Sequence, residues 1–427
     1  MLNVSLKKNF AWAFIGNALS AFFMWLLLVI LTKLGNVEMV GTFAVAQAVG
    51  LPITMFLGLR LQVVQITDAR NEHQFGIYLT LRLLTSVVAI IITAAAGFIF
   101  YSYDTALIIF LLGISYAIVA VRETFLGAMQ KSERMDKMTV GRVLESGLSL
   151  VLFGILYILT HSLAVSVLGL IVSRLMIIFW YDIPTVKKLL AEANMKLMPR
   201  WNRKSLVKLF KVAVPLGFSA WLGQLFTSVP RLVLDKYEGK AEVGYFAAIS
   251  SLLVIGTMVV TSLSQTSSPR LAKYYVENIK AYKFLILKLM GAAILFGIFG
   301  VAVSFFFGRW LLSIMFTPEY AQYNYLFVMM TAAGAILFLY TFMNDSLSSA
   351  RRFDIQLPLC VVAVVACLAA SFVFIPKYGM QGAAISILVC YAAGFLGSLL
   401  SVIYVYRKRV AEIENSKSKA EPEYSRT

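Results

Sequence analysis

The feature that most constrains this chain is a series of long apolar runs. Soluble proteins carry their apolar residues in short periodic stretches, whereas runs of about 20 residues or more recur here. A helix of about 20 residues crosses a bilayer, and in lipid the backbone satisfies its hydrogen bonds as a helix or a closed barrel. We therefore predict an all-α integral membrane protein with twelve transmembrane helices. The predicted spans are Phe10–Leu34, Val40–Gln65, Ile77–Tyr101, Thr105–Gln130, Thr139–Thr160, Leu163–Val186, Leu209–Asp235, Val243–Pro269, Phe284–Phe307, Tyr323–Ala350, Leu357–Pro376 and Met380–Tyr406.

Composition supports this interpretation. The 427 residues are 60% hydrophobic and 14% charged, and the mean hydropathy is +0.82. These values exclude a soluble enzyme, a secreted disulfide scaffold and a nucleic-acid binder. The first run follows Lys7 and Lys8 but exceeds the roughly 7–15 apolar residues of a secretion signal, and no small-x-small cleavage site precedes Gly35. We expect it to be a spanning helix.

The net charge of +17 carries information about topology. Most of the 38 lysine and arginine residues fall at the two termini and in the connections that follow even-numbered spans. Because cytoplasmic loops are enriched in basic residues, both termini are predicted to be cytoplasmic. Four arginines lie inside predicted spans: Arg82, Arg122, Arg142 and Arg174.

The longest connection divides the spans six and six. We predict an N-lobe over 1–186, a basic amphipathic cytoplasmic linker over 187–208, a C-lobe over 209–406 and a polar tail over 407–427. The linker interleaves basic and apolar residues and is expected to lie along an anionic leaflet. The tail is rich in lysine and glutamate, so we expect it to be disordered and assign it no function.

The two predicted lobes share a short sequence repeat. The segment Leu31–Ala44 (LTKLGNVEMVGTFA) aligns without gaps with Leu234–Ala247 (LDKYEGKAEVGYFA), and six of 14 positions match. Both copies cover the end of a lobe's first span, an outer loop and the start of its second span. Six spans separate the copies, so the lobes are predicted to form a parallel repeat related by a pseudo-two-fold axis along the membrane normal. Transporters with such repeats bind substrate between lobes that rock against each other.

These motifs resemble a known family. Each lobe carries a Gly-aromatic motif (VGTFA and VGYFA), the seventh span reads VAVPLGFSAWLGQLFTSVPRLVLDKY, and the last opens with YGMQGAAIS. The pattern is similar to the polysaccharide-transporter branch, which includes O-antigen repeat-unit flippases, of the multidrug/oligosaccharidyl-lipid/polysaccharide exporter superfamily. The resemblance implies a multi-pass protein of the bacterial inner membrane that flips undecaprenyl-pyrophosphate-linked oligosaccharide during lipopolysaccharide or related polysaccharide biosynthesis. It also implies a central cationic cavity, lined largely by the first two spans of each lobe, that works by alternating access.

Arginine is suited to binding the pyrophosphate of such a substrate, because its planar guanidinium donates paired hydrogen bonds. A charge near the bilayer centre costs about 2.5–3.5 kcal/mol, so each such arginine needs a partner or a purpose. The candidate substrate-binding residues are Arg174, Arg60, Arg122, Arg142 and Arg231.

Structural roles for these arginines remain open. Arg142 can pair with Glu145 three residues along its helix, and Arg231 can pair with Asp235. Arg82 is close enough to the interface to extend its charge into it. Arg174 ranks first among the candidates. Asp182 lies on the same helix face but two turns away, which is too far for direct contact with Arg174.

A buried acid makes ion coupling a further expectation. Asp345 lies deep in the tenth span, where a carboxylate can carry protons or bind sodium. Hydrogen bonds from Asn344 or Ser348 are the structural alternative.

Catalytic and metal-binding motifs are not found in the sequence. It has no phosphate-binding loop, no Gly-x-Ser-x-Gly and no histidine spacing typical of zinc, and its three cysteines lie singly in apolar runs. We therefore expect a transporter without catalytic residues, metal or other cofactor, with membrane lipids and a polysaccharide polymerase and chain-length machinery as partners. A multidrug exporter of the same superfamily is one alternative, and a membrane polymerase or glycosyltransferase acting on lipid-linked sugars is the other.

Overall fold

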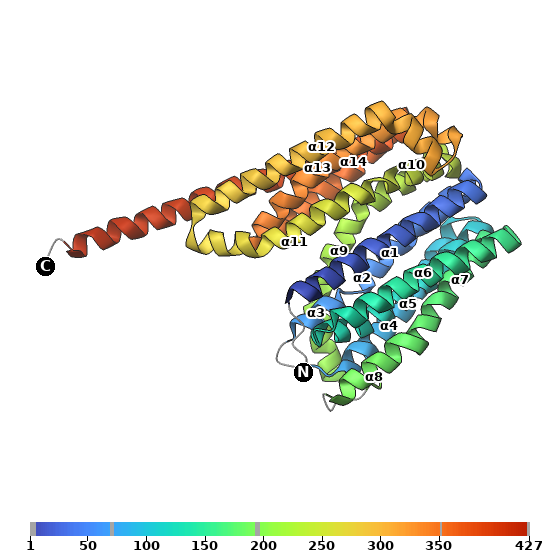
Figure 1. The fold of residues 1–427 in the computed structure, drawn as a ribbon, viewed down its shortest axis with the longest axis horizontal. Helices are drawn as coiled ribbons and strands as arrows, with labels where there is room; N and C mark the ends of the chain where they lie inside the picture. Colours follow the sequence, from blue (N-terminus) through green and yellow to red (C-terminus); the bar gives the residue numbers. More distant parts are fainter. Residues whose placement is uncertain (1–5, 69–71, 193–196, 351, 425–427) are drawn as a thin grey trace. The chain divides into compact units, whose positions relative to one another are not determined.

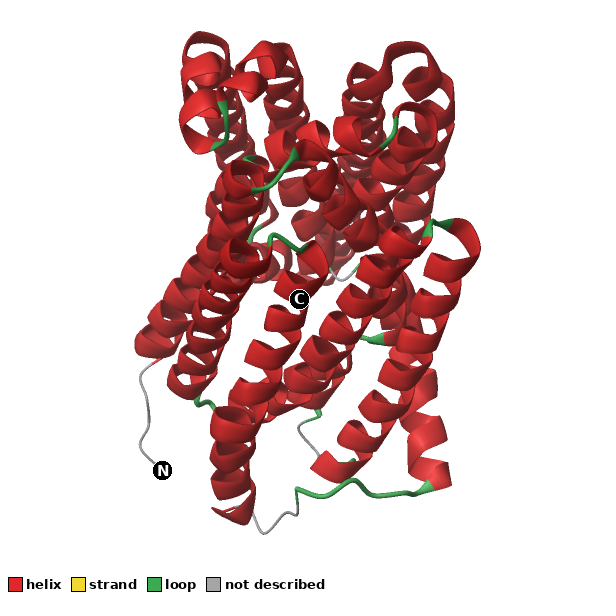
Figure 2. Cartoon of the chain, turned by 90° about the vertical axis from the view of Figure 1, so that its right-hand side faces the viewer, coloured by secondary structure: helices red, strands yellow, loops and turns green. Residues whose placement is uncertain are grey.

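The computed structural model describes residues 6–68, 72–192, 197–350 and 352–424. Within these ranges the chain is helical and contains no β-strand (Figure 2). Eleven of the described helical stretches are long and apolar enough to cross a membrane. The predicted all-α membrane fold is therefore confirmed, while the count of twelve spans and their two-fold relation stay predictions.

Figure 1 shows the helices in chain order. The predicted first six spans correspond to α1 (Leu6–Leu34), α2 and α3 (Val37–Leu57 and Leu61–Thr67), α4 (Phe75–Phe100), α5 (Tyr103–Lys131), α6 (Met135–Thr160), and α7, η1 and α8 (Leu163–Ile177, Ile178–Asp182 and Ile183–Glu192). The remaining spans correspond to α9 (Arg203–Glu238), α10 and α11 (Lys240–Ser251 and Leu253–Glu277), α12 (Ile279–Met315), η2 and α13 (Pro318–Tyr323 and Asn324–Ser349), and α14 (Phe353–Tyr424).

The long helix α14 turns back on itself at Gly379. This residue has φ 52° and ψ −126°, a conformation that glycine adopts without the penalty of a Cβ. A Cβ at Gly382 would lie 2.2 Å from the carbonyl oxygen of Phe374, and one at Gly397 would lie 2.6 Å from the side chain of Leu359. In each contact, one residue precedes the reversal near Gly379 by about as many positions as the other follows it. The predicted eleventh and twelfth spans therefore lie on the two arms of α14.

Packing divides the chain into two units. The first comprises Met1–Ser251 with Met315–Thr317, and the second comprises Leu252–Ile314 with Pro318–Thr427. The first unit therefore includes α9 and α10 as well as the helices of the predicted N-lobe. In it α2 packs against α4, α5, α9 and α10, while α1 packs along α6. The lobe boundaries drawn from the sequence stay a prediction.

The second unit is built from α11, α12, α13 and α14. Its apolar core joins Leu271 of α11, Tyr282 of α12, Phe342 of α13 and Val405 of α14. The hydroxyl of Tyr282 also donates to the carbonyl of Ser346, at 2.9 Å.

The predicted linker is partly folded onto the first unit. Its start lies on α8, where Leu189 and Leu190 are buried among side chains of α4 and α5, and its end lies on α9. Between them, the backbone N–H of Arg200 donates to Gly76 O (3.1 Å). The apolar face of α8 thus packs on protein, and the placement of the linker along an anionic leaflet stays a prediction.

The described residues of the tail after Arg407 continue the preceding helix, and the expectation of disorder stays a prediction. Helix α14 continues to Tyr424. Lysine, glutamate and alanine, which are abundant there, have high helix propensities.

Candidate functional site: a polar network in the first unit

The second predicted span is interrupted in the structure. Helix α2 ends at Leu57, and Leu59 and Arg60 then take left-handed backbone conformations with φ of 53° and 46° before α3 begins. Such a conformation costs a residue with a side chain about 1–3 kcal/mol, so surrounding structure must hold it in place. Arg60 is exposed at this break.

A buried arginine supports the break. Arg82 of α4 is 0% exposed, and its Nη1 donates to the carbonyl oxygen of Gly58 at 2.7 Å. Its Nη2 lies 3.4 Å from Glu123 Oε2. From the other side Gly217 of α9 packs so closely that a Cβ there would lie 2.5 Å from Phe56 O. Arg82, expected from the sequence to extend into the membrane interface, instead braces the interrupted span.

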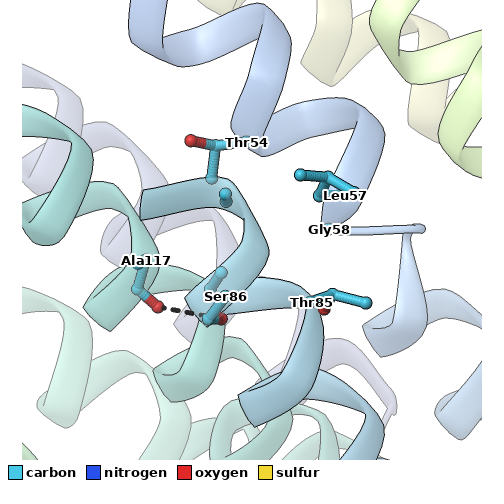
Figure 3. Close-up of a pocket in the computed structure, with 8 residues that line it drawn as sticks. Thr54, Leu57, Gly58, Thr85, Ser86 and Ala117 are labelled. Atoms are coloured by element: carbon cyan, nitrogen blue, oxygen red, sulfur yellow. Dashed lines mark hydrogen bonds between the residues drawn. The ribbon is translucent and has the colours of Figure 1, made fainter. Parts of the chain in front are cut away.

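A narrow crevice lies beside this break. Figure 3 shows that Thr54 and Leu57 of α2, with Gly58 just after its end, line this crevice together with Thr85 and Ser86 of α4 and Ala117 of α5. The hydroxyl of Ser86 donates to the carbonyl of Ala117 at 3.5 Å, drawn as a dashed line in the figure. Small side chains and hydroxyls therefore let three helices approach closely here.

Arg122 and Arg174 meet in a buried ionic cluster. Arg122 Nε lies 2.6 Å from Asp182 Oδ2, and its Nη1 lies 3.2 Å from Glu145 Oε2. Arg174 Nε lies 3.1 Å from the other oxygen of Glu145, and its Nη1 donates to the hydroxyl of Ser115. Glu145 thus bridges two arginines from different helices. Two arginines face two carboxylates, so this cluster, named here the Glu145 cluster, is neutral.

The local fold explains how the partners meet. Asp182 ends the short π-helical segment η1, where a wider turn changes the direction of the following side chains. The Asp182 side chain is fully buried, whereas Glu145 is 12% exposed. Two serines complete the cluster, because Ser149 donates to Glu145 (3.4 Å) and shares a 2.7 Å hydrogen bond with Ser173. Arg122 Nη2 and Asp182 Oδ1 are buried and have no hydrogen-bond partner within the part of the chain that the structure describes.

Arg142 is placed differently. It is half-buried on α6, and its Nη1 donates to the side-chain oxygen of Asn17 on α1 at 2.5 Å. Among the described residues it has no ion pair, because Glu145 pairs with Arg122 and Arg174 instead. The charge count of this network is therefore uneven. Its four arginines, Arg82, Arg122, Arg142 and Arg174, outnumber the three carboxylates that pair with them. Glu123 pairs with Arg82, Asp182 pairs with Arg122, and Glu145 pairs with both Arg122 and Arg174.

The last two candidates lie elsewhere. Arg231 of α9 donates to the hydroxyl of Ser250 on α10 at 3.4 Å, among its contacts. Asp345 is half-buried on α13 in the second unit and accepts a hydrogen bond from Ser264 of α11. Neither Asn344 nor Ser348 donates to it in the described contacts; Gln356 instead donates to both, to the Asn344 carbonyl and the Ser348 hydroxyl, each at 2.6 Å.

The sequence identified every arginine of the network but not its pattern of partners. It did not identify Ser115 or the bridging role of Glu145, because neither has a signal in a single helix. Asn17 is the one residue that such a signal could reveal, as a polar side chain within the first apolar run. In the described residues, no group of three or more histidine, cysteine, aspartate or glutamate side chains could hold a metal ion.

Comparison with known proteins identifies the family. The model of a family described as "Polysaccharide biosynthesis protein" matches residues 6–275, well over half of the chain. The chain belongs to this family. It is also 29% identical over 402 residues to the capsular polysaccharide biosynthesis protein CapF of Staphylococcus aureus, covering 94% of this chain and 99% of CapF.

Solved structures show that the fold of this family member is shared with transporters. The lipid II flippase MurJ in an inward closed conformation superposes with a TM-score of 0.75 at 12% identity, covering 92% of this chain and 89% of MurJ. An inward-facing multidrug transporter of the MATE family, within the MOP superfamily, gives 0.65 at 14% identity, covering 97% of each chain. A MOP-superfamily transporter from Pyrococcus furiosus gives 0.63 at 14% identity, covering 95% of this chain and 96% of the other. The fold predicted from the motifs is thereby confirmed.

Proposed function

We propose that this protein is a flippase that moves undecaprenyl-pyrophosphate-linked oligosaccharide, the repeat unit of a surface polysaccharide, from the inner to the outer leaflet of the bacterial inner membrane. Membership of a polysaccharide biosynthesis family and a fold shared with a lipid II flippase support this proposal. The capsular relative makes capsule a substrate class beside O-antigen. Alternating access, with both termini in the cytoplasm, is part of the proposal.

The observation that carries the proposal is the uneven charge of the network in the first unit. Placing an arginine in a membrane costs about 2.5–3.5 kcal/mol, and three of the four recover this cost through carboxylates. In the described contacts, Arg142 donates to the neutral side-chain amide of Asn17 and forms no ion pair of its own. An anionic ligand would supply the missing negative charge, so we assign Arg142 as the residue that binds the substrate's pyrophosphate.

The chemistry of this pair suits the role. A guanidinium has five N–H donors in a planar fork, and the described contacts of Arg142 use one of them, on Asn17. The amide therefore orients the guanidinium while leaving donors for phosphate oxygens. On the predicted topology the pair lies in the cytoplasmic half of the bilayer, where the lipid-linked substrate is made available. Arg60, exposed at the break of the second span, is proposed as a further contact.

The Glu145 cluster has a different proposed role. Arg122 and Arg174 are only 3% and 2% exposed, and those of their donors that have partners in the described contacts are directed at carboxylates and Ser115. We therefore assign them to holding α5, α6 and α7 together. Asp345, with Ser264, is proposed to bind the proton or sodium ion whose gradient drives transport.

Substitution of Arg142 tests the assignment. A hydrogen bond to a charged group is worth about 1.5–3 kcal/mol, so Arg142→Ala should lower export roughly ten- to hundredfold. Arg142→Lys keeps the charge but loses the fork and should fall between Arg142→Ala and the wild type. Surface polysaccharide and membrane content of each variant would be measured in a strain without the chromosomal gene.

Arg309→Ala is the matched control, because Arg309 is exposed on α12 at the predicted outer end. It should export normally. Normal export by Arg142→Ala, at normal membrane content, would contradict the assignment.

A further inference from the structure

Helices α2 and α10 approach each other through two glycines. A Cβ at Gly41 would lie 1.7 Å from the carbonyl oxygen of Lys240, and a Cβ at Gly244 would lie 2.2 Å from the carbonyl oxygen of Val37. Real Cβ atoms essentially never come within 3.0 Å of another heavy atom. Both obstacles are backbone atoms, which cannot rotate away as a side chain can. At this crossing, therefore, both helices require glycine.

The two contacts are reciprocal. Gly41 and Gly244 are the glycines of VGTFA and VGYFA, and Val37 and Lys240 also occupy equivalent positions of the repeat. Gly41 faces the carbonyl of Lys240, and Gly244 faces the carbonyl of Val37, so the two contacts involve equivalent residues with the two copies exchanged. One observation comes from sequence alignment and the other from the coordinates, and they agree on the same four residues. This is the arrangement expected where a pseudo-two-fold axis passes between the two copies of a repeat.

Buried apolar residues surround the two glycines. Val40 and Val243 are each 0% exposed, and Phe246 beside them is also fully buried. The side chain of Lys240 adds a hydrogen bond to the hydroxyl of Thr105 on α5. Such close backbone packing stabilises helix pairs in lipid through van der Waals contacts rather than through burial from water.

The contact also determines which unit α10 joins. Helix α10 ends at Ser251 and packs in the first unit, whereas α11, which begins at Leu253, belongs to the second. On the predicted topology Gly41 and Gly244 lie near the outer surface of the membrane. Helices α10 and α11 therefore belong to different packing units although they are consecutive along the chain.

We propose that the Gly41–Gly244 contact closes the outer side of the protein and opens once in each transport cycle. This inference rests on the proposed alternating access. It assigns to the two repeated glycines a positioning role: their lack of side chains allows the outward-closed state to form. A side chain at either position should shift the protein towards an outward-open state.

Accessibility of a buried cysteine measures this shift. Val243→Cys would be introduced after Cys360, Cys367 and Cys390 are replaced by serine. Intact cells would then be treated with a membrane-impermeant maleimide. Gly41→Ala should raise the labelling rate at position 243 about tenfold, which requires a shift of only ~1.4 kcal/mol. Gly244→Ala should act in the same direction, because the contact is reciprocal.

Gly300→Ala is the matched control, since a Cβ on that glycine would meet no described atom within 4 Å beyond its own stretch of helix. It should leave labelling unchanged. Hydrogen exchange of the α2 and α10 amides in the purified glycine variants measures the separation of these two helices without a cysteine. Exchange is expected to be faster than in the wild type.

Unchanged labelling and unchanged hydrogen exchange in both glycine variants would overturn the inference. An equal rise in Gly300→Ala would do the same, because the effect would then be unspecific. Neither readout requires substrate, so failure here is distinguishable from failure of the proposed function, which the export measurement tests.

Discussion

Neutralising Glu145 should destabilise the protein more than most single substitutions. Glu145→Gln preserves the shape of the side chain but removes its charge, so the Glu145 cluster changes from two arginines and two carboxylates to a net charge of +1. Removing one partner of a buried ion pair costs about 3–5 kcal/mol, because the other charge stays buried without compensation. At about 2 °C per kcal/mol for a unit of this size, the melting temperature should fall by roughly 6–10 °C.

A second substitution separates charge balance from loss of contacts. Arg174→Met removes the arginine whose only carboxylate partner in the described contacts is Glu145. Combined with Glu145→Gln, it leaves Arg122 with Asp182 and makes the cluster neutral again. The double variant should therefore be more stable than Glu145→Gln alone, although it has lost more hydrogen bonds. This outcome would be a favourable coupling energy in a double-mutant cycle.

The assay is thermal unfolding of each purified variant in detergent, followed by tryptophan fluorescence. Glu238→Gln is the control, because Glu238 is exposed at the end of α9, and its change should stay within about 0.5 kcal/mol. The reasoning is refuted if Glu145→Gln has the same melting temperature as the wild type. It is also refuted if the effects of Glu145→Gln and Arg174→Met on stability simply add in the double variant.

Three further predictions concern residues outside the cluster. Arg82→Met removes the brace of the interrupted span and should cost about 1–3 kcal/mol of stability, seen as a lower melting temperature. Asp345→Asn should leave folding intact but abolish the dependence of export on an ion gradient; unchanged dependence would exclude Asp345 from coupling. Partial burial opposes ionisation of Asp68, but hydrogen bonds from the backbone of Glu72 and His73 outweigh it and hold the pKa of Asp68 below its ordinary 3.8. Its contribution to stability should therefore be present above pH 4 and decline as pH falls through the lowered pKa, a decline that Asp68→Asn should remove from melting curves.

The limits of the spans were largely predictable from the sequence. The predicted span Ile77–Tyr101 corresponds to α4 over Phe75–Phe100, because a polar segment bounds an uninterrupted apolar run. Interruptions were not predictable in the same way. Leu59 and Arg60 lie in an apolar run with no glycine or proline at either position, and tertiary contacts hold their left-handed conformations.

The partners of the arginines could not be predicted, since spacing along one helix does not fix how that helix is rotated in the bundle. Arg142 and Glu145 share a helix face by spacing, yet Glu145 bridges arginines of two other helices. The repeat likewise identified Gly41 and Gly244 as equivalent residues. The repeat could not indicate that the two copies are in contact, because residues related by a symmetry axis can lie at any distance from that axis.

The leaflet that holds lipid-linked glycan in cells lacking this protein tests the central claim most directly. The glycans would be extracted and identified by mass spectrometry, after impermeant modification from outside distinguishes the two leaflets. The proposed function predicts complete repeat units accumulating on the cytoplasmic leaflet, and their return to normal levels with the wild-type chain. Single units on the outer leaflet would contradict it in favour of a polymerase, and unchanged glycans with raised sensitivity to cationic drugs would contradict it in favour of a multidrug exporter.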